Sequence, residues 1–186
     1  SESGTLQETS YTDEESAVVD VVRRTNPAVV NIGIFEKASS VVGRRSNTFP
    51  FDDFFGPGFP FEFEAPESAP PAGSEEGELQ QVGGGSGFLV SDDGLIVTNR
   101  HVVADETATY KVTLADGKEY DATVLAKDPV LDVALMKIEA TGLPTLSLGN
   151  SDNLYIGQTV IAIGNALAEF GNTVTRGVVS GIGRRV

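Results

Sequence analysis

Cysteine and tryptophan are absent from the 186 residues, and histidine occurs once. Without cysteine the chain has no disulfide framework, no thiolate metal site and no cysteine nucleophile. A single histidine excludes a His-rich metal site as well. These absences exclude cysteine chemistry and thiolate or His-rich metal sites, but they do not settle the redox compartment.

Basic residues are also few, with 13 Lys and Arg against 27 Asp and Glu, for a formal net charge of −14. This balance argues against nucleic-acid binding, because the phosphate backbone needs a basic surface. It equally argues against docking on an anionic membrane face. No run approaches the about 18 apolar residues of a membrane span. No charged-then-apolar leader follows Ser1, although a membrane anchor removed upstream of it would leave no trace.

Hydrophobic residues make up 40% of the chain, which is enough for a packed core in one or two domains. Residues 1–12 are polar, and we expect a flexible N-terminus there. Thr12 followed by Glu15 fits a capping box, and Pro27 ends the apolar spacing after it. This pattern predicts a short amphipathic helix over residues 13–25.

Short runs rich in β-branched residues then alternate with turn signals. Six strands are predicted by the runs at 28–35, 88–91, 95–99, 109–114, 119–126 and 133–138. The Asp92-Asp93-Gly94 step is typical of a hairpin turn. This spacing favours an all-β barrel or sandwich. Two further strands are predicted at 158–163 and 173–182.

Residues 37–84 differ from the rest and are predicted to form a long Phe-, Pro- and acid-rich loop insert. Seven of the ten phenylalanines fall between Phe49 and Phe63. A loop of this length is either disordered or functional. In the second interpretation the aromatic side chains dock on a neighbouring subunit or into the chain's own cleft.

Two residues stand out as candidates for chemistry. His101 follows an apolar strand at its end, where an imidazole can meet solvent on one side and a fixed partner on the other. Asp132 lies between apolar residues at the start of a later strand, where an unpaired carboxylate is costly to bury. An imidazole N–H would serve as its partner, and such a pair suits the activation of a serine hydroxyl. Asp121 and Asp128 have more polar surroundings and are interpreted as solvated residues of a turn or of a strand face.

No serine in the sequence stands out as the nucleophile. Ser86 lies in a glycine-rich run, but Phe88 stands where a nucleophile elbow needs its second glycine. We interpret this run as a flexible entry to the next strand. Ser147, Ser151 and Ser180 lack a suitable glycine-rich turn.

The order and spacing of six short segments resemble the protease part of the HtrA/Deg family of trypsin-like serine endopeptidases. The matching segments are Gly85–Phe88, Thr98–Val103, Asp128–Leu135, Leu148–Ser151, Ala162–Asn165 and Thr173–Ile182. Arg100 departs from the small or amide residue that usually precedes the histidine, and Ala166 departs from the usual proline.

The resemblance implies a trypsin-like double β-barrel with the site in the cleft between the barrels. It places the short helix and a complete first barrel in residues 13–141, and the start of a partial second barrel in 142–186. It implies that His101 is the general base and Asp132 its orienting carboxylate, with no metal and no cofactor. It also implies a homotrimer that degrades unfolded or misfolded proteins in the cell envelope, periplasmic or extracytoplasmic.

The family's serine lies in a Gly-Asn-Ser-Gly-Gly turn beyond the last matching segment. We therefore expect the chain by itself to be inactive, and to be aggregation-prone or partly disordered beyond residue 142. Two other interpretations stay open. One is a catalytically dead, chaperone-like or binding relative with the same scaffold. The other is an unrelated acidic all-β interaction domain, in which His101 and Asp132 would not meet.

Overall fold

The computed structural model describes residues 13–37, 79–164 and 173–182. Helix α1 (Asp13–Thr25) has the bounds that the capping pattern predicts, and it is followed by the short 3₁₀ helix η1 (Asn26–Ala28). The predicted flexible N-terminus lies outside the described residues, as does the part of the insert that holds the phenylalanines. No helix in the described ranges is both long enough and apolar enough to cross a membrane.

Six antiparallel strands close into one barrel in the order β1-β2-β3-β6-β5-β4. Their bounds are β1 (Val29–Lys37), β2 (Leu79–Leu89), β3 (Leu95–Thr98), β4 (Thr109–Thr113), β5 (Glu119–Lys127) and β6 (Ala134–Ile138). Pairing of β1 with β4 closes the barrel, so the six predicted strands are confirmed and a sandwich is excluded. Closure leaves no unpaired strand edge, which is the physical reason for this architecture.

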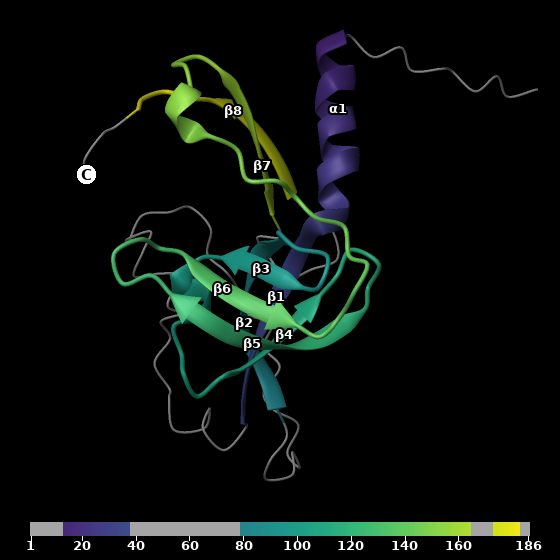
Figure 1. Ribbon diagram of the computed structural model, residues 1–186, viewed down its shortest axis with the longest axis vertical. Helices are drawn as coiled ribbons and strands as arrows, with labels where there is room; N and C mark the ends of the chain where they lie inside the picture. The colour runs from purple at the N-terminus through teal and green to yellow at the C-terminus, as the bar shows by residue number, and fades with distance from the viewer. Residues whose placement is uncertain (1–12, 38–78, 165–172, 183–186) are drawn as a thin grey trace, which may run out of the picture.

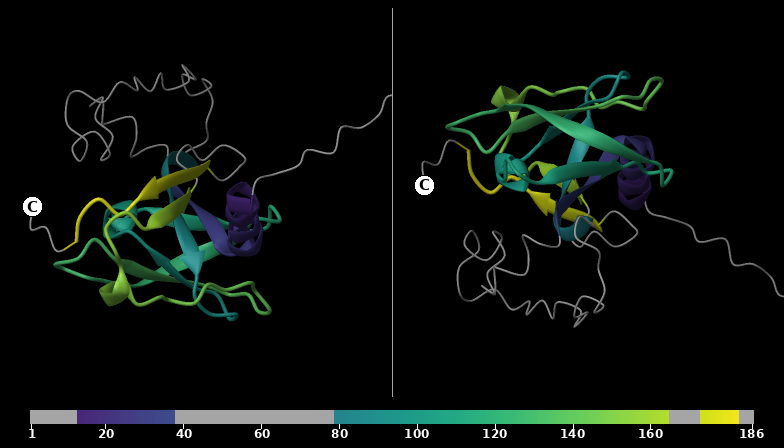
Figure 2. Two further views of the ribbon diagram at one scale, coloured as in Figure 1. Left: turned by 90° about the horizontal axis from the view of Figure 1, so that it is seen from above. Right: turned by 90° about the horizontal axis from the view of Figure 1, so that it is seen from below.

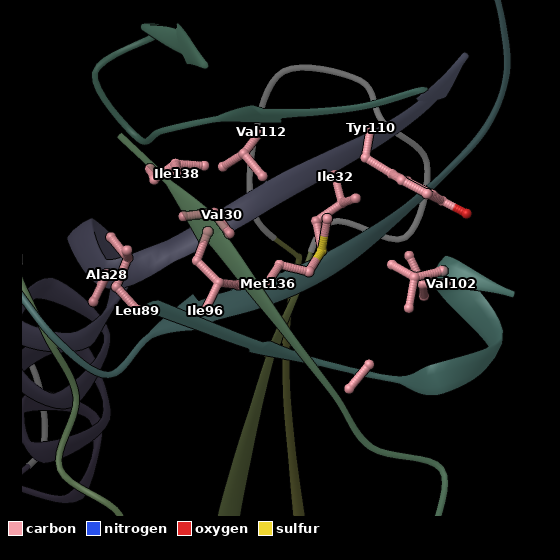
Figure 3. Packing of buried hydrophobic residues seen from close by; sticks show 12 residues of the cluster. Ala28, Val30, Ile32, Leu89, Ile96, Val102, Tyr110, Val112, Met136 and Ile138 are labelled. Atoms are coloured by element: carbon pink, nitrogen blue, oxygen red, sulfur yellow. The ribbon is translucent and has the colours of Figure 1, made fainter. Parts of the chain in front are cut away.

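The barrel interior is filled by apolar side chains that alternate along the strands. On β6, Ala134, Met136 and Ile138 are buried, while the two residues between them are partly exposed. Met136 lies beside Ile32 in the centre of this cluster (Figure 3). The period of two along each strand therefore sends one face inward, as the sequence pattern predicts.

The glycine run before Phe88 is part of strand β2, so the prediction of a loop up to residue 84 and of a flexible entry around Ser86 is wrong. Strand β2 begins at Leu79 and pairs with β1, with Ser86 opposite Asn31. The glycines serve close packing instead of flexibility. A Cβ on Gly85 would lie 2.6 Å from Val102 Cγ1, and a Cβ on Gly87 would lie 2.9 Å from Ile96 Cγ2.

A second, smaller sheet follows the barrel. After the 3₁₀ helix η3 (Ser151–Asn153), strands β7 (Thr159–Gly164) and β8 (Thr173–Val178) pair antiparallel. Strand β8 ends four residues before the predicted bound at 182. The β7–β8 sheet and α1 lie at the same end of the barrel in Figure 1, and the views in Figure 2 agree. The division at residues 141/142 stays a prediction, because Leu146 N still donates to Leu89 O of the barrel at 2.8 Å.

Substituting Gly94 by alanine should strongly destabilise the barrel. Gly94 has a φ of +100°, and a Cβ there would collide with the carbonyl oxygen of Ile138. We expect Gly94→Ala to lower the free energy of unfolding by more than about 2 kcal/mol, measured by urea titration.

Gly117→Ala is the matched control, because Gly117 has a φ of +83° with no atom within 4 Å of its Cβ position. Its free energy of unfolding should fall by only about 1–2 kcal/mol, which is the cost of a left-handed backbone at a residue with a Cβ. Equal losses in the two variants would show that the contact with Ile138 is unimportant.

Candidate active site

The candidate site forms where two neighbouring barrel strands meet. Strands β3 and β6 are paired, with Thr98 opposite Ala134. Just beyond Thr98 the chain enters the 3₁₀ helix η2 (Arg100–Val103), which carries His101. Asp132 lies two residues before Ala134. Strand pairing therefore brings together two residues that are 31 positions apart in the sequence.

The His101 and Asp132 side chains are in direct contact. His101 Nδ1 lies 2.6 Å from Asp132 Oδ2, and the backbone N–H of His101 donates to Asp132 Oδ1 at 2.9 Å. Each side chain keeps slightly more than a third of its surface exposed. Both carboxylate oxygens of Asp132 are thus engaged by one residue, and the pair still meets solvent.

The charge state of Asp132 fixes the tautomer of the imidazole. Partial burial raises the pKa of Asp132, but hydrogen bonds from the backbone and imidazole of His101 outweigh this and hold the pKa below its ordinary value. An ionised carboxylate only accepts hydrogen bonds, so the proton between the two side chains belongs to His101 Nδ1. In the neutral imidazole, Nε2 then carries the lone pair and can accept a proton.

Asn99 is the second residue whose side chain contacts Asp132. Its Nδ2 lies 3.0 Å from the backbone oxygen of Asp132 and 3.2 Å from Oδ2. Asn99 lies in one of the segments that resemble the HtrA/Deg family, but nothing in one sequence shows where its side-chain amide points.

Asp128 shapes the loop that carries Asp132. Its Oδ1 accepts from the backbone N–H groups of Val130 at 2.8 Å and Leu131 at 2.6 Å. Its own N–H donates to Val133 O at 2.9 Å, which closes the loop around Asp132. The two hydrogen bonds to its carboxylate, that to Leu131 first, hold the pKa of Asp128 below its ordinary value. Asp128 is the turn residue that the sequence suggested, whereas Asp121 lies exposed on β5.

A groove of about 520 Å³ runs along one side of the candidate site. The barrel contributes residues such as Asn99 and Asp132, β7 contributes Ile161 and Ile163, and α1 contributes Val21. A second hollow of about 570 Å³ lies over β4 and β5 and includes neither His101 nor Asp132. The first groove is therefore the one that the His101–Asp132 pair adjoins.

The described part of the chain contains no group of three or more His, Asp or Glu side chains that could hold a metal ion. Ser86, the serine of the glycine-rich run, lies on β2, where its carbonyl accepts from Thr98 Oγ1 at 2.8 Å. The structure thus gives Ser86 a place in the β2–β3 pairing.

A closed six-stranded barrel, with a partly exposed imidazole paired to a carboxylate at its strand ends, fits the trypsin-like peptidase fold. The sequence model of the trypsin-like peptidase domain matches residues 85–186, which is more than half of the chain. The chain belongs to this family, and within it to the HtrA/Deg group that the segment pattern resembles.

Three relatives illustrate the similarity. A probable periplasmic serine endoprotease DegP-like protein of Pseudomonas fulva is 43% identical over 88% of the chain, and one of Chlamydia pneumoniae is 44% identical over 88%. A putative serine protease HhoA of Synechocystis is 40% identical over 91% of the chain. The chain spans 34%, 33% and 40% of the length of these three proteins, respectively.

Removing the Asp128 carboxylate should loosen the loop before β6. We expect Asp128→Ala to speed amide hydrogen exchange at Val130 and Leu131 by about tenfold, since each loses a hydrogen bond to a charged acceptor. Asp116→Ala is the control, because Asp116 makes the same kind of turn contact, to Lys118 N, in the β4–β5 turn. Unchanged exchange at Val130 and Leu131 in a folded Asp128→Ala variant would contradict this role.

Asp132 should make a pH-dependent contribution to stability. Because its pKa in the folded state lies below the ordinary 3.8, this contribution is present above that value and is lost as the pH falls through the lowered pKa. Urea unfolding should show that Asp132→Asn is less stable than the wild type at pH 5, with the gap shrinking below pH 3.8. Asp121→Asn should show no such gap. A gap for Asp132→Asn that persists unchanged at low pH would contradict the assignment.

Proposed function

We propose that this chain is the N-terminal part of the protease domain of a serine endopeptidase, with His101 as general base and Asp132 as its orienting carboxylate. The observation that carries the proposal is the 2.6 Å contact between His101 Nδ1 and Asp132 Oδ2. Family membership supports the reaction class. The same contact argues against an unrelated acidic β domain, in which the two residues would have no reason to meet.

The proposed mechanism follows from the tautomer of the His101 imidazole. Asp132 accepts the Nδ1–H of His101 and holds the imidazole in the tautomer whose Nε2 is the base. A serine hydroxyl that attacks a peptide carbonyl passes its proton to Nε2, and the imidazolium later delivers that proton to the leaving amine. The carboxylate stabilises the imidazolium and stays ionised throughout.

The proposal also includes the location of the nucleophilic serine. We assign it to a serine outside these 186 residues, because no serine of the chain lies in a suitable glycine-rich turn. The relatives, about three times as long as the stretch matched here, leave room for it. Reading the gene beyond Val186 tests this point. A Gly-x-Ser-Gly-Gly turn supports an enzyme, whereas its absence favours a chaperone-like or binding relative.

Protein substrates, an extracytoplasmic location and a homotrimeric assembly complete the proposal. The first two are supported by relatives that are named periplasmic serine endoproteases. Unfolded or misfolded proteins as the substrate class and the homotrimer rest on the HtrA/Deg resemblance. Mass photometry of the full-length protein tests the trimer, and fractionation of the source cells tests the location.

Substitutions in the His101–Asp132 pair should abolish proteolysis in the full-length protein. We expect His101→Ala to lose activity on unfolded casein, and Asp132→Asn to lower kcat by roughly 10⁴-fold because the imidazole tautomer is no longer fixed. Rates are measured by release of labelled peptides, and thermal melting checks that each variant is folded. Asp121→Asn, on the exposed face of β5, should keep wild-type activity. Wild-type rates in His101→Ala would contradict the proposed base.

A further inference from the structure

The side chain of Asn99 has an unusual hydrogen-bond partner. Asn99 is the N-cap residue of η2, and asparagine at an N-cap commonly accepts a hydrogen bond from its own helix. Here its side chain makes no such capping bond. Its Nδ2 instead donates to Asp132, 33 residues along the chain. The backbone oxygen of Asn99 still accepts from Val102 N at 3.2 Å, so the residue is anchored on η2 while its amide reaches across.

This amide holds Asp132 at two points. It lies 3.0 Å from the backbone oxygen and 3.2 Å from Oδ2, and an amide NH₂ group has two donors for the two acceptors. Linking the carboxylate to its own backbone restricts rotation of the side chain. The carboxylate oxygen that Asn99 contacts is also the one that accepts from His101 Nδ1. Asn99 therefore fixes the acceptor of the imidazole proton.

The hydrogen-bond donor of Asn99 is neutral, which affects the balance of charge between Asp132 and His101. Asn99 stabilises the ionised carboxylate through a hydrogen bond without adding a charge beside the imidazole. Arg100 stands between Asn99 and His101 in the chain, and its charge acts on the carboxylate of Asp128. Only the hydrogen bonds of His101 and Asn99 hold the carboxylate of Asp132 among the described residues.

We propose that Asn99 is a positioning residue of the active site, which locks the Asp132 carboxylate in place for the imidazole of His101. This inference rests on the proposed function insofar as it concerns catalysis. The Asn99 side chain does not touch the reacting atoms; it acts on them through Asp132 and His101.

Two variants of the full-length protein test the role. Asn99→Ala removes both donors, and we expect kcat to fall roughly 10- to 100-fold with KM unchanged, since substrate contacts are untouched. Asn99→Asp keeps the shape but places a second carboxylate near the imidazole, since Asn99 Nδ2 lies 3.2 Å from Asp132 Oδ2 and that oxygen lies 2.6 Å from His101 Nδ1. It should move the acid limb of the kcat/KM profile to higher pH by about one unit, because added negative charge favours the imidazolium.

A second readout does not depend on proteolysis. The imidazole of His101, the one histidine of these 186 residues, is followed by NMR in the full-length protein, where the loss of its resonances in His101→Ala assigns them. In the full-length Asn99→Asp variant, the midpoint of the pH titration of these resonances should also rise by about one pH unit. Gln80→Glu is the matched control, with the same amide-to-carboxylate change on β2 at roughly 20 Å from the strand end that pairs with Thr98. It should leave both midpoints unchanged.

The outcomes separate the two proposals. A lower melting temperature in both Asn99 variants, with kcat within twofold of wild type and both midpoints unmoved, would overturn the positioning role and leave an ordinary structural hydrogen bond. A wild-type protein without peptidase activity whose NMR midpoint still shifts in Asn99→Asp would overturn the proposed function and support the link among Asn99, Asp132 and His101.

Discussion

Pairing of strand β3 with strand β6 is the constraint on which the candidate site depends. The register that sets Thr98 opposite Ala134 places η2 beside the loop that carries Asp132. A slip of one residue would turn every side chain of β6 to the other face of the barrel. It would expose Met136 and move Asp132 away from His101. The packing that buries the core and the contact that defines the site are therefore consequences of one alignment.

The immediate surroundings of Asp132 show how a half-exposed carboxylate is kept ionised and immobile. Donors come from the backbone and imidazole of His101 and from the side chain of Asn99. Asp128 closes the loop on the other side through Val130 and Leu131. These donors stabilise the ionised form of the Asp132 carboxylate, which therefore keeps its negative charge beside the imidazole of His101.

The two sheets differ in how their stability arises. The barrel satisfies its own strand edges and encloses a core of fully buried residues such as Ile32 and Met136. Strands β7 and β8 pair only with each other in the described ranges, and Val160, Val174 and Val178 keep 40–59% of their surface exposed. A two-stranded sheet is marginal in water, so this one depends on contact with the barrel and α1 along the groove.

Local patterns determined a large part of this protein. The Thr12–Glu15 pattern and Pro27 predicted the bounds of α1. Alternating apolar residues and the Gly94 turn predicted strands, and the position of His101 and Asp132 at strand ends marked them as candidates. Only the tertiary structure decided the rest, because it depends on contacts between residues distant in the sequence. The glycines of β2 look flexible until Val102 and Ile96 are seen to fill the space beside them. In the same way, Asn99 has the appearance of a helix cap until strand pairing brings Asp132 within its reach.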